Sequence, residues 1–347
     1  MIPRSTPSRI ACLEKNDRET VSWQALYADC ITEPSELALR LGLPDSVLNG
    51  ADAASGQFRL RIPRSFLPQI QPGDPDDPVL KQFLPTGAET VEKAGYVSDP
   101  VGDLNAMPTD GLLHKYEGRV LLMISSACAV HCRYCFRRNF PYDQATLSQE
   151  KLQQALHYIS MNSSIHEVIL SGGDPLSVSD EKLNTVIQQL EAIPHVQRLR
   201  FHTRLPVIIP QRITNTLMSM LEQTRLNTVL VTHINHPNEI SEELKQALQN
   251  LRNCNITLLN QSVLLRGIND NIETLQALSE KLFSCGVLQY YLHMLDKASG
   301  TSHFEVDEKT ALDLHQGLST RLGGYLVPKL VRETEGKPCK VSLNKGC

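Results

Sequence analysis

The segment 125–138, which reads SSACAVHCRYCFRR, places Cys128, Cys132 and Cys135 within eight residues. Cysteine thiolates are soft ligands that suit zinc, copper(I) and iron–sulfur clusters. A structural zinc ion normally takes a fourth Cys or His at comparable spacing, and His131 is poorly placed to close a tetrahedron with its neighbours already bound. Three thiolates and a vacant position instead predict a four-iron four-sulfur (4Fe-4S) cluster with one open iron. The same loop carries three arginines that we expect to offset part of the cluster's negative charge: Arg133, Arg137 and Arg138.

From Gly118 onward, short apolar segments alternate with helical patterns. Such alternation predicts a parallel sheet with helices outside it, built from six strand–helix units and a final strand. Right-handed crossovers can curl this sheet into a full or partial (β/α) barrel, although the pattern also permits an open doubly wound sheet. The expected strands are 119–124, 166–171, 198–203, 227–234, 256–260, 288–295 and 325–331, and the expected helices are 148–162, 179–193, 214–223, 239–253, 272–286 and 307–324.

Polar side chains stand at or just beyond the carboxyl ends of five expected strands: Ser171, His202, His233, Gln261 and His293. In barrels of parallel strands this rim carries the active site. A single histidine at such a place is more often a satisfied core or loop residue. Five polar strand ends on one rim favour the barrel and predict that these side chains converge.

The first part of the chain has no regular strand–helix alternation. We expect a helix over 22–43 and a linker or loop over the Pro- and Asp-rich stretch 71–85. This gives three regions: an N-terminal helical or irregular extension (1–110), the α/β barrel (111–331) and a short C-terminal tail (332–347).

The bulk composition excludes some classes of protein. A formal net charge of −4 and a pI near 6.3 give no general attraction to nucleic acid or to membranes. The sequence has no apolar run of membrane-spanning length and no signal-peptide pattern at its start. Nine irregularly spaced cysteines do not form a disulfide framework. We therefore expect a cytoplasmic protein.

The cysteine loop resembles the signature of radical S-adenosylmethionine (SAM) enzymes. Tyr134 precedes the last cysteine, as in that superfamily, and the loop follows the first expected strand. The segment SGGDP, at 171–175, resembles the superfamily's glycine-rich segment for the methionine amino group. The resemblance implies that the protein binds SAM at the open iron and forms a 5′-deoxyadenosyl radical.

A narrower resemblance covers residues 100–340. The blocks CRYCFRRNF, LSGGDPL, PQRIT, NHPNEI, NQSVLLRGIND and GYLVPKLV resemble lysine 2,3-aminomutases. The stretches SWQALYADCITEPSEL, RIPRSF, GDPDDPVLKQFL and GLLHKY are similar to one bacterial branch, which supplies (R)-β-lysine for modification of translation elongation factor P. This implies an isomerase that moves the amino group of L-lysine and also uses pyridoxal 5′-phosphate.

The C-terminal region offers four lysines for the covalent attachment of pyridoxal phosphate: Lys329, Lys337, Lys340 and Lys345. Composition alone makes no choice among them. Counted from the YLVP block, the family's lysine falls on Lys340. In free-lysine enzymes it follows a run of glycines, of which this chain keeps only Gly336.

The resemblance also implies the groups that hold charge on the ligands. Arg119 and Lys115 match positions that hold the cofactor's phosphate, and Arg137 matches the arginine that binds the substrate carboxylate. Asp296 and Glu333 match the acids that bind the substrate's side-chain ammonium, which argues against a glutamate 2,3-aminomutase. The positions that match contacts to SAM or to the pyridoxal ring are Ser171, Gly172, Gly173, Asp174, His233 and Gln261.

The resemblance implies functional links to elongation factor P, to its β-lysine ligase and to an external one-electron reductase. One alternative is a stand-alone aminomutase that makes β-lysine as an osmolyte or for catabolism. Family members of that kind carry a C-terminal extension, whereas this sequence stops seven residues after Lys340, which favours the elongation-factor branch. A second alternative is a non-catalytic iron–sulfur or zinc scaffold.

Overall fold

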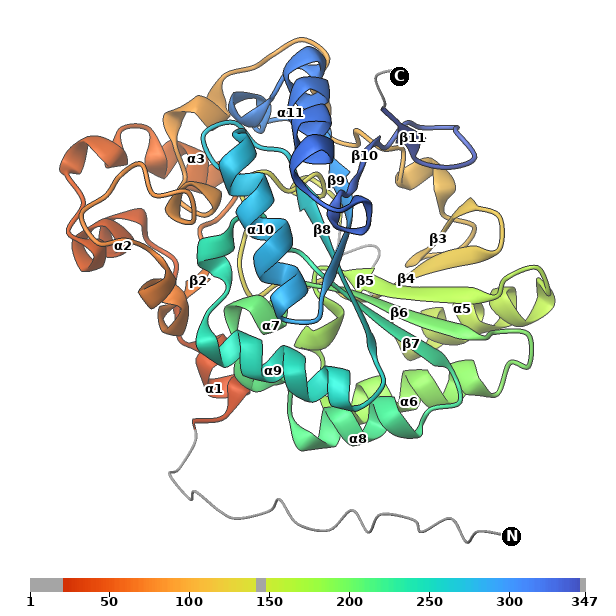
Figure 1. The fold of residues 1–347 in the computed structure, drawn as a ribbon. Helices are drawn as coiled ribbons and strands as arrows, with labels where there is room; N and C mark the ends of the chain where they lie inside the picture. Colours follow the sequence, from red (N-terminus) through yellow and green to blue (C-terminus); the bar gives the residue numbers. More distant parts are fainter. Residues whose placement is uncertain (1–20, 142–147, 344–347) are drawn as a thin grey trace, which may run out of the picture.

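The computed structural model of the protein describes residues 21–141 and 148–343 (Figure 1). Within these ranges one sheet has the strand order β11-β10-β9-β8-β7-β6-β5-β4-β3. Strands β4 to β10 run parallel, whereas β3 and β11 pair antiparallel at the two ends. The strands are β3 (Leu112–Tyr116), β4 (Arg119–Ser125), β5 (Glu167–Gly172), β6 (Arg198–Thr203), β7 (Asn227–Thr232), β8 (Thr257–Val263), β9 (Leu288–His293), β10 (Lys329–Arg332) and β11 (Val341–Ser342).

This strand order follows the chain without a reversal. A doubly wound sheet reverses its order at a switch point, so the doubly wound alternative is wrong. Sequential right-handed crossovers put the helices on one side of the sheet, where Figure 1 shows them. Because β3 and β11 do not pair with each other in the described chain, the fold is a partial parallel barrel. Its six βα units and final parallel strand confirm the expected architecture.

The crossover helices begin at polar residues that cap them. Ser148, Ser179, Thr214, Ser241 and Asn271 each accept a hydrogen bond from the backbone N–H three residues later. Such a cap stabilises a helix by about 0.5–2 kcal/mol relative to alanine. The helices are α5 (Gln149–Met161), α6 (Asp180–Glu191), α7 (Leu205–Ile208), α8 (Asn215–Gln223), α9 (Glu242–Asn253), α10 (Ile272–Ser284) and α11 (Glu308–Arg321).

The single helix expected over 22–43 is wrong. The structure has α1 (Trp23–Ala28) and α2 (Pro34–Leu41), separated by β1 (Cys30–Ile31), which pairs with β2 (Ile62–Pro63). Pro34 is the physical reason, because proline disfavours helical backbone at the residue before it and is well suited to the first turn of a new helix. Glu33 accordingly has extended backbone, with φ −103° and ψ 126°.

The stretch 71–85 is not a linker, which corrects a second expectation. Val79, Leu80 and Phe83 are fully buried in the same core as the barrel. Asp77 nucleates the turn, since one of its carboxylate oxygens accepts hydrogen bonds from the backbone N–H groups of Val79 and Leu80 at 2.8 and 2.7 Å. The acidic and proline residues thus shape a turn whose apolar side chains cover the sheet.

The remaining N-terminal helix is α3 (Ala51–Gln57), and short 3-10 turns connect the elements. The turns are η1 (Asp45–Leu48), η2 (Arg64–Gln69), η3 (Leu80–Gln82), η4 (Gly87–Thr90), η5 (Leu104–Ala106), η6 (Pro175–Ser177), η7 (Pro210–Arg212), η8 (Pro237–Glu239), η9 (Ser302–Phe304) and η10 (Gly324–Leu326). At the other end, β11 folds back on β10 and joins the sheet. Among the described residues, no helix has the length and apolar character needed to cross a bilayer.

Candidate active site

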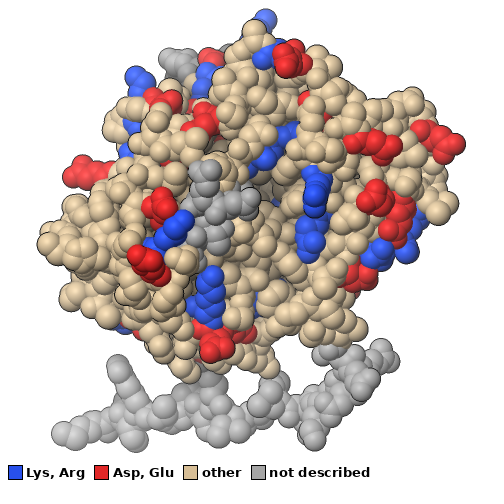
Figure 2. All heavy atoms as spheres, turned by 180° about the vertical axis from the view of Figure 1, so that it is seen from behind, with Lys and Arg blue, Asp and Glu red and all other residues tan. Residues whose placement is uncertain are grey.

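A cavity of about 620 Å³ opens at the carboxyl ends of the parallel strands. Figure 2 shows the hollowed face of the molecule, with Lys and Arg side chains beside the hollow. All five polar strand ends line the cavity: Ser171, His202, His233, Gln261 and His293. Their convergence confirms the inference from the strand ends, because parallel strands in sequential order bring their carboxyl ends to one rim.

Cys128, Cys132 and Cys135 line one part of this cavity and form no disulfide. Tyr27 Oη and Arg61 Nε donate hydrogen bonds to the carbonyl oxygen of Cys128, at 3.2 and 3.0 Å, and so fix the start of the loop. Burial raises the pKa of the Cys135 thiol to about 11, so the thiolate form needs a positively charged partner. Within the described ranges, no three His, Cys, Asp or Glu side chains are grouped as ligands of one metal ion. The three cysteines share the lining of one cavity instead.

The glycine-rich segment lies directly against the cysteine loop. The backbone N–H of Gly173 donates to Ser125 O, and that of Asp174 donates to Ala127 O, both at 2.8 Å. A Cβ atom on Gly173 would lie 2.5 Å from Ala127 O, and Gly172 has φ +120°. Only glycine fits both positions, and the bare backbone is left open toward the cavity.

The carboxylate of Asp174 faces the protein. It accepts hydrogen bonds from Thr203 Oγ1 at 2.7 Å and from the backbone N–H groups of Arg204 and Leu205 at 2.7 and 2.9 Å. A fourth hydrogen bond, from Leu176 N, caps the turn η6. Asp174 therefore joins the ends of β5 and β6 and holds the glycine segment in place.

The arginines of the cysteine loop have protein partners. Arg133 Nε and Arg138 Nη2 donate to the buried carboxylate of Glu89, at 2.8 and 2.9 Å. Arg137 Nε donates to Asp103 at 2.6 Å. Two carboxylates thus pair with three arginines, and the charges of Arg137 and Arg138 still lower the pKa of the Cys135 thiol against the larger effect of burial. That these arginines offset a cluster's negative charge stays a prediction. The arginine that reaches a cysteine sulfur is Arg204, which the sequence analysis did not single out.

Two of the expected anion-binding groups share one carboxylate. Asp103 is buried, and it pairs with Lys115 Nζ and with Arg137 Nε, both at 2.6 Å. Burial opposes the ionisation of Asp103, but the two cations hold its pKa below the usual value. Arg119 packs over the ring of Tyr116 at 4.4 Å and lines the cavity. Asp103 was missed because nothing in its local sequence distinguishes it from a solvated acid.

Lys340 lines the cavity, whereas Lys329 and Lys337 do not, and Lys345 lies outside the described residues. Its Nζ atom donates to Glu333 Oε2 at 2.5 Å, and the hydroxyl of Tyr116 donates to Glu333 Oε1. Burial raises the pKa of Asp296 to about 7 against the opposing charge of Lys340. A lysine and two acids therefore lie together at one part of the cavity wall.

The histidines of the rim are neutral at physiological pH, because burial lowers the pKa of His202, His233 and His293, that of His233 to about 3. Gln261 Nε2 donates to His233 Nε2 at 2.9 Å. The Nε2 atoms of His202 and His293 are buried and have no hydrogen-bond partner in the described part of the chain. Unpartnered buried polar atoms are costly, and both of these belong to residues that line the cavity.

These features fit the three groups that the resemblance implies. The thiols have the chemistry of iron–sulfur ligands, the glycine segment lines the cavity without side chains and so leaves room for a small ligand, and Lys340 offers an amine.

Comparisons with known proteins agree with this site. Residues 122–278 match the family model described as the Radical SAM superfamily. The chain is 48% identical over 332 residues to the L-lysine 2,3-aminomutase of Haemophilus influenzae, covering 96% of this chain and 98% of that protein. It is 45% identical over 339 residues to that of Escherichia coli, covering 97% and 98%. The L-lysine 2,3-aminomutase of Clostridium subterminale is 37% identical over 322 residues, covering 92% and 77%.

Proposed function

We propose a function from one premise: this chain belongs to the L-lysine 2,3-aminomutase family within the radical SAM superfamily. It is an isomerase that converts L-lysine to β-lysine, and it uses a 4Fe-4S cluster, SAM and pyridoxal phosphate. The cluster and SAM supply a 5′-deoxyadenosyl radical when bound, and pyridoxal phosphate supplies a conjugated ring that stabilises an unpaired electron during the amino shift. The residue assignments rest on one observation: the same cavity is lined by Cys128, Cys132, Cys135 and Lys340.

We assign the three cysteines as cluster ligands. The residues that would hold SAM are those of the glycine-rich segment and the neighbouring strand ends: Ser171, Gly172, Gly173, Asp174, His233 and Gln261. Asp174 acts by holding the glycine segment in place, since its carboxylate, its backbone N–H and its backbone carbonyl are all bonded to the protein. The neutral histidines donate or accept hydrogen bonds without adding positive charge beside the sulfonium of SAM.

We assign Lys340 as the covalent anchor of pyridoxal phosphate, with Lys115 and Arg119 as cations for its phosphate. Lys340 is preorganised by Glu333, which holds the ammonium at the cavity wall until the cofactor arrives. The buried pair of Lys115 with Asp103 keeps that cation in place, although Asp103 also offsets its charge. Arg119 is the less compensated of the two, because it packs over the ring of Tyr116, which offsets less positive charge than a carboxylate does.

L-lysine carries a carboxylate and a distant ammonium, and the cavity offers complementary charges for both. Arg137 lies within 3.5 Å of Ser171 Oγ beside the glycine-rich segment and binds the carboxylate. Asp296 and Glu333 bind the ammonium. With its pKa raised to about 7 by burial, against the charge of Lys340, Asp296 is partly protonated near neutral pH, and an arriving ammonium favours the carboxylate form.

The test is anaerobic reconstitution of the full chain, followed by incubation with SAM, L-lysine and a one-electron reductant. We expect β-lysine, detected by mass spectrometry, together with iron, sulfide and pyridoxal phosphate in the same sample. Cys132→Ser abolishes the product, whereas Cys254→Ser, outside the cavity, does not. Lys340→Ala removes the visible absorbance of bound pyridoxal phosphate, whereas Lys337→Ala retains it. Zinc in place of iron would support the non-catalytic scaffold instead.

We further propose that this enzyme acts in the cytoplasm, forms (R)-β-lysine and supplies it to the ligase that modifies elongation factor P. The blocks in the N-terminal extension that are similar to the elongation-factor branch support this assignment. An external one-electron reductase has to reduce the cluster. Deletion of the gene should shift the mass of elongation factor P by one β-lysyl group, whereas an unchanged mass would favour the stand-alone alternative.

A further inference from the structure

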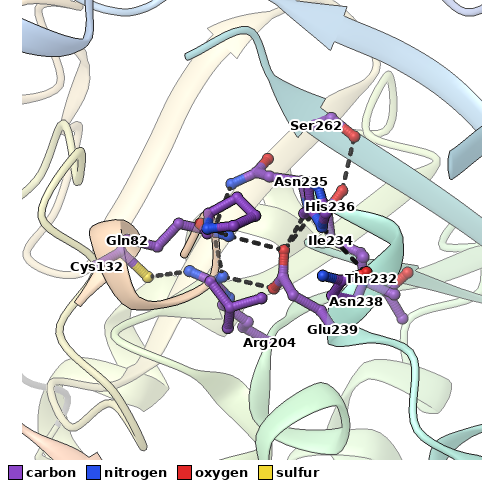
Figure 3. A network of polar contacts seen from close by, with 12 residues as sticks. Gln82, Cys132, Arg204, Thr232, Ile234, Asn235, His236, Asn238, Glu239 and Ser262 are labelled. Carbon is purple, nitrogen blue, oxygen red and sulfur yellow. Dashed lines mark hydrogen bonds and ion pairs between the residues drawn. The ribbon is translucent and has the colours of Figure 1, made fainter. Parts of the chain in front are cut away.

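Arg204 lies at the point where the strand β6 ends and α7 begins, and its side chain is buried. Its Nη1 atom donates to Cys132 Sγ at 2.7 Å (Figure 3). The same atom donates to Tyr134 Oη, also at 2.7 Å. Two groups of the cysteine loop are therefore bound by one guanidinium from a distant part of the chain.

The other side of the guanidinium is held as firmly. Nη2 donates to Gln82 Oε1 and to Glu239 Oε2, both at 2.6 Å. The ring of Phe83 covers the guanidinium plane at 4.7 Å. Arg204 has a planar fork of donors, and its partners come from η3, from η8 and from the cysteine loop, so the side chain has one orientation.

Glu239 is fully buried and has a full set of partners. Its Oε1 atom accepts hydrogen bonds from Gln82 Nε2 at 3.1 Å and from the backbone N–H groups of Asn235 and His236 at 2.8 and 2.9 Å. The carboxylate is therefore fixed by groups that do not move with Arg204. A buried arginine–carboxylate pair adds little net stability. Because this pair has so many contacts, its effect is to fix the positions of both side chains.

We propose that Arg204 is a positioning residue that sets the reduction potential of the cluster through its hydrogen bond to Cys132 Sγ, and that Glu239 and Gln82 hold it there. This inference rests on the proposed function, which places a 4Fe-4S cluster at the three cysteines. The cluster gains one electron from a low-potential one-electron donor and becomes more negative by one charge. Donors directed at a ligand sulfur stabilise that added charge, and such hydrogen bonds are among the factors that tune cluster potentials.

The proposal also gives the N-terminal extension a role. Gln82 lies in the stretch 71–85, and its side chain binds both members of the Arg204–Glu239 pair. Its carbonyl oxygen accepts the backbone N–H of Arg133 at 2.9 Å. One residue of the extension thus holds the guanidinium and the cysteine loop at a fixed separation.

The test measures the midpoint potential of the cluster in the reconstituted full chain, without SAM or L-lysine, by electron paramagnetic resonance during an anaerobic titration with dithionite. We expect Arg204→Gln to lower the equilibrium constant for reduction at least tenfold, which corresponds to a potential about 59 mV more negative. Glu239→Gln removes the opposing negative charge and shifts the potential in the positive direction.

Arg212→Gln is the matched control. Arg212 is also fully buried, also pairs with an acid, Asp180 at 2.8 Å, and also covers an aromatic ring, that of Trp23 at 4.5 Å. Its Nε atom donates to Leu176 O at 2.6 Å rather than to a cysteine. We expect its equilibrium constant for reduction to stay within twofold of the wild type, although its stability falls as well.

A loaded Arg204→Gln variant with the potential of the wild type would overturn the inference while leaving the proposed function intact. If this variant does not fold or hold iron, Glu239→Gln decides, and an unchanged or more negative potential refutes the inference. A wild-type chain that binds no iron–sulfur cluster would remove the proposed function and this inference together.

Discussion

Asp296 gives the sharpest test of the electrostatics of the cavity. Burial raises the pKa of its carboxyl group to about 7, whereas an aspartate in the unfolded chain has a pKa near 3.9. Between these two values the folded chain binds more protons than the unfolded chain. The free energy of unfolding therefore falls as the pH rises through this window, which is the opposite of the behaviour of a salt-bridged aspartate.

The magnitude follows from the shift. Each pKa unit corresponds to 1.36 kcal/mol, so the two units between pH 5 and pH 7 amount to about 3 kcal/mol. Water in the cavity reaches part of the carboxylate, whose residue is only half-buried, and reduces this to about 1–3 kcal/mol. Asp296→Asn removes the ionisable group and keeps the shape. In the cofactor-free chain, the change in unfolding free energy caused by this substitution should therefore be about 1–3 kcal/mol more favourable to the folded state at pH 8 than at pH 5.

The assay is urea denaturation of the wild type and the variant at pH 5 and pH 8, under reducing conditions and without cofactors. Asp52→Asn is the control, because Asp52 is exposed on α3, so its change in unfolding free energy should be the same at both pH values. An effect of Asp296→Asn that is equal at pH 5 and pH 8 would refute the reasoning. The same variant should bind L-lysine more weakly in the reconstituted enzyme, since a neutral amide does not pair with an ammonium.

Three further predictions concern packing and charge in the site. Asp103→Asn leaves Lys115 and Arg137 buried beside a neutral amide, and urea denaturation should show a loss of about 3–5 kcal/mol, far more than for Asp76→Asn on the exposed surface. Gly173→Ala forces the glycine segment away from Ala127 and should weaken SAM binding at least tenfold in equilibrium dialysis, whereas Gly324→Ala, with open space around it, should leave binding unchanged. Phe83→Ala should cost about 3–5 kcal/mol in the same denaturation assay, because the ring is fully buried, and a loss below 1 kcal/mol would show that the stretch 71–85 does not share the barrel core.

The sequence predicts the parts of the site whose positions follow from regular structure. The alternation of strands and helices predicted the sheet. Because parallel strands end at one rim, it also predicted that Ser171, His202 and His293 lie near one another, and all three line the cavity. The site partners Asp103 and Arg204 could not be found this way. Asp103 comes from the extension, so its pairing with Arg137 depends on how the extension folds over the barrel. Arg204 reaches Cys132 from another part of the barrel, 72 positions away in the chain, and no local pattern indicates such a pairing.

The same dependence explains why the N-terminal extension is packed so tightly against the cysteine loop. Glu89 pairs with Arg133 and Arg138, and Asp103 pairs with Arg137, so both acids of the extension hold arginines that follow the loop's cysteines. Buried ion pairs contribute little net stability compared with apolar packing, but breaking one leaves a buried charge and is costly. The cysteine loop is therefore held in one geometry, because moving it would break buried ion pairs and leave buried charges without partners. A site that has to hold three sulfurs around one cluster benefits from that rigidity more than from added stability.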